Sequence, residues 1–153
     1  MKQIKKILTP ATHIELVRSK GSKFGRILMG LLFVVTGVLM MMNGDATTEY
    51  FITLGVPMAS LLVWPILILK VGAGAAIIVG KRTTEAAAIL IIFTLIATLL
   101  AHLDPQTDPS FPIGMLKNLA IVGGLLYLMS FGPHGMNVSG EDALSPALPK
   151  RHT

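Results

Sequence analysis

The chain has 153 residues, of which 52% are hydrophobic and 14% are charged, with a net charge of +5 and a mean hydropathy of +0.70. Soluble domains carry about 25% charged residues, so this composition excludes an ordinary water-soluble domain. The absence of cysteine excludes disulfide relay, thiolate catalysis and iron–sulfur ligation by this chain.

Positive charge is concentrated near the start of the chain. Seven of the thirteen Lys and Arg residues precede residue 27, in a segment that adjoins the first apolar stretch. A basic segment at a membrane surface gains about 1 kcal/mol per Lys or Arg from an anionic leaflet. This placement favours the lipid bilayer as the partner, and we expect no nucleic-acid partner.

Four apolar stretches predict four membrane-spanning helices, at residues 27–42, 58–79, 86–103 and 115–131. Stretches of about 16 to 22 residues, at about 1.5 Å per residue in a helix, approach the hydrocarbon thickness of a bilayer. The sequence therefore predicts an all-α integral membrane four-helix bundle. The predicted parts of the chain are a basic juxtamembrane tail at residues 1–25, the four-span domain at residues 26–134 and a flexible tail at residues 135–153.

The basic residues also predict the orientation of the bundle. Eleven Lys or Arg residues lie in the two tails and the second connection, whereas the first and third connections, residues 43–57 and 104–114, contain none. By the positive-inside rule, we expect both termini in the cytoplasm and these two connections on the outer side of the membrane.

Two local patterns add detail to this bundle. Residues 47–54 predict a short helix in the first outer connection, capped by Thr47 or Thr48. Close backbone approach drives helix association in lipid, so small residues within the spans predict helix contacts. The side chains expected on one side of the short helix are Tyr50, Phe51 and Leu54, and the glycines expected at helix contacts are Gly30, Gly37, Gly72, Gly74, Gly123 and Gly124.

Polar side chains within the spans are the candidate functional residues, because each is costly in lipid unless it has a partner or a role. The third span has a polar stripe at Thr94, Thr98 and His102, spaced by four residues. We predict a ligand pocket in the outer half of the bundle. Its predicted residues are Lys70, His102, Lys117 and Asn118, with Trp64 as a stacking wall. The alternative is that these groups bond to one another and only stabilise the bundle.

Several motifs occur in a specific order along the chain. They are Thr36-Gly37, Leu54-Gly55-Val56-Pro57, Gly80 followed by Thr83, Ala97-Thr98 with His102, Lys117-Asn118 followed by Gly123-Gly124, and Phe131-Gly132-Pro133. In these features the chain resembles the DoxX family of small four-span bacterial membrane proteins. The resemblance implies a location in the bacterial inner membrane, and a role as a membrane subunit of a quinone-linked oxidoreductase.

Two positions depart from the family pattern. Relatives often carry a Lys three residues after the glycine that matches Gly37, and a Glu in the middle of the second span, whereas this chain has Met40 and Lys70 there. Lys70 is then a buried base or counter-ion, an uncharged amine, or an amine that extends outward toward Asp45 or Asp104. In each case the chain lacks the Glu that relatives have at this place.

We expect no covalently bound cofactor and no metal site. Haem held by two histidines is unfavourable, because His102 is the only histidine in the predicted bundle. Methionines gather near the predicted outer surface, but thioethers serve more often as flexible apolar filler than as Cu(I) ligands. A bound quinone is the cofactor that the resemblance implies.

Three functional classes fit the sequence. In the first, Lys117 and His102 bond quinone carbonyls while a partner redox protein supplies the electrons. The second is a non-catalytic anchor or assembly partner of a redox or stress-response complex. The third is a small-molecule transporter or permeability factor, against which the lack of inverted repeats and of a continuous polar path argues. The oligomeric state stays open.

Overall fold

The computed structural model describes residues 10–101 and 110–132, with side chains from residue 20 onward. The described helices are α2 (Pro10–Met42), α3 (Gly44–Thr53), α4 (Ala59–Val79), α5 (Thr83–Ala101) and α6 (Ile113–Phe131). Four of them are long and apolar enough to cross a membrane: the Lys20–Met42 part of α2, and all of α4, α5 and α6. The predicted all-α architecture with four spans is therefore confirmed.

The first helix is longer than its predicted span. It begins at Pro10 instead of residue 27, because no helix breaker other than glycine interrupts the polar segment before the span, and proline is tolerated in a first helical turn. Hydropathy alone detects the part of a helix that lies in lipid and misses its polar extension.

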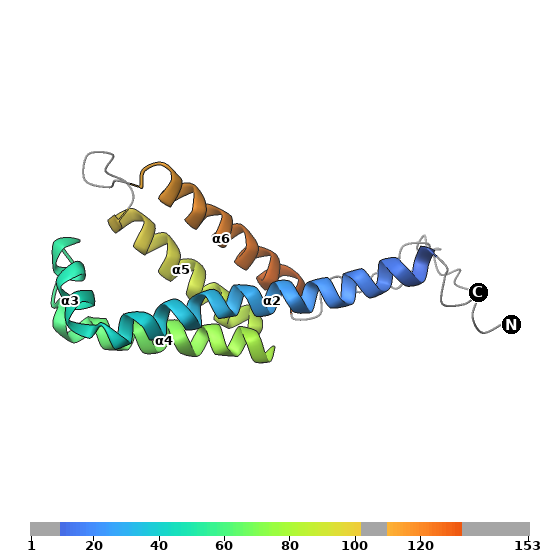
Figure 1. The fold of residues 1–153 in the computed structure, drawn as a ribbon, viewed down its shortest axis with the longest axis horizontal. Helices are drawn as coiled ribbons and strands as arrows, with labels where there is room; N and C mark the ends of the chain where they lie inside the picture. Colours follow the sequence, from blue (N-terminus) through green and yellow to red (C-terminus); the bar gives the residue numbers. More distant parts are fainter. Residues whose placement is uncertain (1–9, 102–109, 133–153) are drawn as a thin grey trace, which may run out of the picture.

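The four spans form two helix pairs. Helix α2 packs mainly against α4, and α5 packs mainly against α6. The pairs meet near the turn between α4 and α5 and separate toward α3, as Figure 1 shows. We call the end near the α4–α5 turn the closed end and the end near α3 the open end.

Glycine allows α2 and α4 to approach each other closely. A Cβ atom on Gly30 would lie 2.6 Å from the carbonyl oxygen of Gly74, and one on Gly74 would lie 2.9 Å from that of Gly30. A Cβ on Gly37 would likewise lie 2.6 Å from Val71. The prediction of helix contacts is wrong for Gly72 and Gly123, which have no such neighbour within 4 Å, since they lie on exposed faces of their helices.

The packed core lies toward the closed end. Phe33, Ile77, Leu90 and Leu125 come from the four different spans and are buried in one cluster. A second cluster at the open end joins α3 to α4 and contains Phe51, Ala59, Val63 and Leu67. Because this second cluster includes no residue of α5 or α6, it does not fill the space between the two helix pairs at the open end.

The short helix α3 begins earlier than predicted. It starts at Gly44, and its N-cap residue Asn43 makes no side-chain capping bond. Thr47 and Thr48 therefore lie inside the helix, and the prediction that one of them caps it is wrong. The Thr47 hydroxyl donates to the carbonyl of Met40 at 2.9 Å, which attaches α3 to the end of α2.

Large apolar side chains cover the outside of the spans. Leu39, Ile68, Ile96 and Leu126 are all exposed to the surroundings of the protein. A contiguous apolar exterior of this kind is unfavourable in water and favourable in hydrocarbon. The outer faces of the helices therefore contact the lipid bilayer.

Candidate functional site

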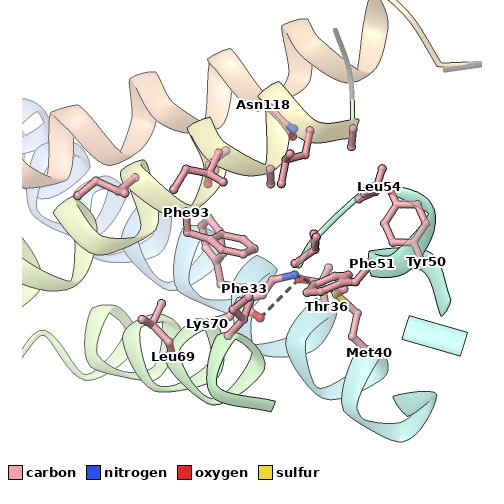
Figure 2. A pocket seen from close by; sticks show the side chains of 18 of the residues that line it. Phe33, Thr36, Met40, Tyr50, Phe51, Leu54, Leu69, Lys70, Phe93 and Asn118 are labelled. Carbon is pink, nitrogen blue, oxygen red and sulfur yellow. Dashed lines mark hydrogen bonds between the residues drawn. The ribbon is translucent and has the colours of Figure 1, made fainter. Parts of the chain in front are cut away.

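A cavity of about 830 Å³ lies between the two helix pairs at the open end, within the size range of small-molecule sites. Its lining is largely aliphatic and aromatic and comes from α2 to α6 and from the connection between α3 and α4. Figure 2 shows the side chains that define it. The aromatic residues that line the cavity are Phe33, Tyr50, Phe51 and Phe93, and the polar ones are Thr36, Lys70, Thr94, Lys117 and Asn118.

Lys70 of α4 is the buried amine of this cavity, with 8% of its surface exposed. Its Nζ atom lies 3.4 Å from Sδ of Met40 and 5.6 Å from the centroid of the Phe93 ring. Figure 2 shows the amine in the cavity, extended toward Met40. A thioether is a weak acceptor and a ring face attracts a cation only moderately, so these neighbours satisfy little of a lysine's capacity to donate hydrogen bonds.

The amine has no acidic partner among the described residues. No Asp or Glu occurs among the described residues that line the cavity. Of the three alternatives for Lys70, an extension toward Asp45 is not observed, since the described contacts of the amine are Met40 and Phe93. The other expected partner, Asp104, lies outside the described residues.

Met40 and Lys70 are the two positions at which the sequence departs from the family pattern, and they are in direct contact. The contact exists because Gly37, one turn before Met40, packs against the Lys70–Val71 segment of α4. At this contact the chain has a thioether facing an amine.

Asn118 connects α6 to the polar stripe of α5. Its Nδ2 atom donates to the Thr98 hydroxyl at 3.0 Å. The hydroxyls of Thr98 and Thr94 donate in turn to the carbonyls of Thr94 and Leu90 at 2.6 and 2.7 Å. Thr94 and Thr98 are buried, so the described part of the predicted polar stripe faces inward, and the Asn118–Thr98 bond stabilises the α5–α6 pair.

The structure brings Lys70, Lys117 and Asn118 to one cavity. Lys117 is exposed near the start of α6, whereas Asn118 is half-buried. The remaining predicted member of this polar group, His102, lies outside the described residues. The candidate site therefore centres on Lys70, with Lys117 and Asn118 at the α6 side of the cavity.

Trp64, the predicted stacking wall, does not line this cavity. Its indole is 47% exposed, is absent from the cavity lining and packs near Gly44, where an added Cβ would lie 3.1 Å from it. Six residues along a helix correspond to a rotation of about 240°, so Trp64 and Lys70 point in different directions. Phe93 and Phe51 supply aromatic walls instead, and no sequence signal distinguishes these aromatic residues from those that face lipid.

The fold and the cavity define a small all-α membrane protein whose ligand-sized space contains one buried amine. The chain belongs to the DoxX family, whose model matches residues 21–103. It is 32% identical over 117 residues to "Inner membrane protein YphA" of Escherichia coli strain K12, covering 74% of this chain and 84% of that protein. It is also 31% identical over 118 residues to "Inner membrane protein YqjF" of the same strain, covering 77% and 88%.

No solved structure matches the chain. The names of the two relatives and the four apolar helices show a multi-pass protein of the inner membrane. The family membership therefore identifies the kind of protein and its location.

Proposed function

We propose that this protein is the quinone-binding membrane subunit of an oxidoreductase, and that the open-end cavity holds the quinone head group. The observation that carries the proposal is Lys70, an amine 8% exposed in an apolar cavity and without a carboxylate partner among the described residues. A buried donor with an unfilled hydrogen-bonding capacity favours a ligand that supplies an acceptor oxygen.

The residues around the amine suit a quinone. Lys70 donates to one carbonyl oxygen and, as an ammonium, stabilises negative charge that develops there. The rings of Phe93 and Phe51 line the cavity (Figure 2), and in this proposal a planar head group lies against them. Lys117 and Asn118 provide donors at the α6 side of the cavity.

A bound quinone supplies the redox chemistry, and the electrons come from a partner redox protein. The chain has no cysteine, and the described residues contain no cluster of three or more His, Cys, Asp or Glu that could hold a metal. The contribution of the chain is therefore to bind and orient the head group and to exclude water from it.

The proposal includes an orientation with both termini in the cytoplasm, which places the open end near the outer surface. The positive-inside rule supports it. An impermeant thiol reagent applied to spheroplasts should label Thr53→Cys in α3 and not Lys81→Cys in the α4–α5 turn. The reverse labelling would place the open end at the cytoplasmic surface.

A non-catalytic anchor is the second candidate, and the Asn118–Thr98–Thr94 hydrogen bonds favour it, because they show polar groups that satisfy one another within the bundle. A transporter is less well supported. The closed end is filled by buried Phe33, Ile77, Leu90 and Leu125, so the cavity does not continue through the bundle as described.

Equilibrium binding of a short-chain quinone to the purified protein in lipid nanodiscs tests the proposal. The parent should bind, Lys70→Met should bind at least about tenfold more weakly, which corresponds to about 1.4 kcal/mol, and Lys81→Met should match the parent. Lys81 is the control because it is an exposed lysine of the same charge in the α4–α5 turn. A folded parent without quinone binding would favour the anchor.

A further inference from the structure

We propose that the open-end cavity selects an anionic amphiphile, and that among quinones it prefers those with an acidic ring hydroxyl over neutral ones. This inference rests on the proposed function in that it treats the same cavity as a ligand site. It goes further by assigning the charge of the head group.

The charge of the lining favours an anion. Among the described residues that line the cavity, the charged ones are two lysines, Lys70 and Lys117, and none is an Asp or Glu. Lys70 is buried against Met40, a neutral thioether. An ammonium in a low-dielectric site is unfavourable without a counter-ion, and among the described residues the protein supplies none here.

The bound state is the same whether Lys70 is an ammonium or an uncharged amine before the ligand binds. In the first case Lys70 is already an ammonium and pairs with an anionic head group. In the second case Lys70 is an uncharged amine and takes the proton of an acidic head group. In the second case the O–H bond of the ligand breaks and an N–H bond forms on Nζ. Both routes give one ammonium paired with one anion, so the buried site becomes electrically neutral around Lys70.

The shape of the cavity favours a ligand with a hydrocarbon chain. The cavity extends from Lys70 along apolar side chains of α4 and α5, among them Leu69, Ile92 and Ile96. These three side chains are also exposed on the outer faces of their helices. A hydrocarbon chain can therefore pass from the head group into the bilayer, which favours an amphiphile over a small inorganic anion.

Three probes with alkyl chains of nearly the same length test the inference in nanodiscs of uncharged lipid at neutral pH. They are a decyl hydroxynaphthoquinone, the matching decyl naphthoquinone without the hydroxyl, and decanoate. Calorimetric titration of the full chain should give at least about tenfold tighter binding of the hydroxylated quinone than of its neutral match. Chloride and phosphate should not compete at equal concentration.

Two variants test whether the preference for the hydroxylated quinone depends on Lys70. Lys70→Met should abolish the difference between the two quinones. Met40→Glu should also abolish it, because the new carboxylate lies beside Lys70 and takes the place of the ligand's charge. Lys81→Met should retain the parent's preference. Size-exclusion profiles and thermal unfolding confirm that each variant is folded. Because two different substitutions should remove the preference between the quinones, the test does not depend on the stability of one variant.

The outcomes separate this inference from the proposed function. Equal affinity for the two quinones would overturn the anion preference and leave quinone binding standing. Binding of decanoate without either quinone would support the anionic site and refute the quinone function. A preference that survives in both Lys70→Met and Met40→Glu, or binding of none of the probes, would overturn the inference.

Discussion

The closed and open ends of the bundle are built from the same four helices, yet they differ in what fills the space between them. At the closed end each span contributes buried apolar side chains to one core. At the open end the space between the pairs is a cavity that contains a buried amine and its thioether neighbour. This difference predicts that stability depends mainly on the closed end and ligand binding on the open end, so substitutions at the two ends should have different consequences.

The largest expected effect comes from the α2–α4 contact that holds one helix pair together. Gly30→Leu should lower the free energy of unfolding by about 3 kcal/mol, since its side chain would overlap the Gly74 backbone and Ile78. Denaturation by SDS in mixed micelles measures this. Gly72→Leu is the matched control and should change stability by less than about 0.5 kcal/mol, because nothing lies within 4 Å of an added Cβ there.

A comparison of two leucines tests the difference between the ends directly. Leu125→Ala at the closed end removes a side chain with 0% exposure and should lower the free energy of unfolding by about 2 kcal/mol. Leu54→Ala at the open end, where the side chain lines the cavity, should lower it by less than about 1 kcal/mol. The same SDS titration serves for both. Equal losses would show that the two ends are packed alike.

Lys70→Met should change stability in the opposite direction. Replacing a buried charge with an apolar side chain of similar length is neutral or stabilising, so we expect the free energy of unfolding to rise by about 1 kcal/mol. Quinone binding should fall in the same variant. A variant that is destabilised as strongly as Gly30→Leu would show that Lys70 is needed for packing and not for a ligand.

The smallest expected effect belongs to the polar contact of the α5–α6 pair. Asn118→Ala should cost about 0.6 kcal/mol, the average for a polar contact between membrane helices. A double-mutant cycle with Thr98→Val isolates the Asn118–Thr98 hydrogen bond. A coupling energy near zero would show that this bond does not stabilise the α5–α6 pair.

The sequence predicts the four spans well, because their length and hydropathy depend only on the thickness of the bilayer. It predicts the separation of the helix pairs poorly, because an apolar helix does not specify which of its faces meets a neighbour and which meets lipid. Gly30 and Gly72 illustrate this, since both are glycines within spans and only Gly30 lies at a helix contact.

The candidate site likewise combines residues that the sequence identifies with residues that only the fold identifies. Lys70 stands out as a charged residue in an apolar span, whereas Phe93 and Phe51 have no feature that marks them before the fold is known. The sequence marks Met40 only by its departure from the pattern of the family that the chain resembles. Its contact with Lys70 depends on the packing of Gly37 against α4. Trp64 lies in the same span as Lys70, but the helical rotation between the two residues turns its side chain away from the cavity lining.

Photocrosslinking tests the central claim, that the open end is the ligand site, most directly. An azidoquinone should be photolysed with the purified protein in nanodiscs, and the adducts should be mapped by mass spectrometry. We expect adducts on cavity-lining segments around Lys70 and Phe93, and their loss when excess unlabelled quinone is present. Adducts spread over the lipid-facing surfaces of all four spans, unchanged by the competitor, would contradict the account.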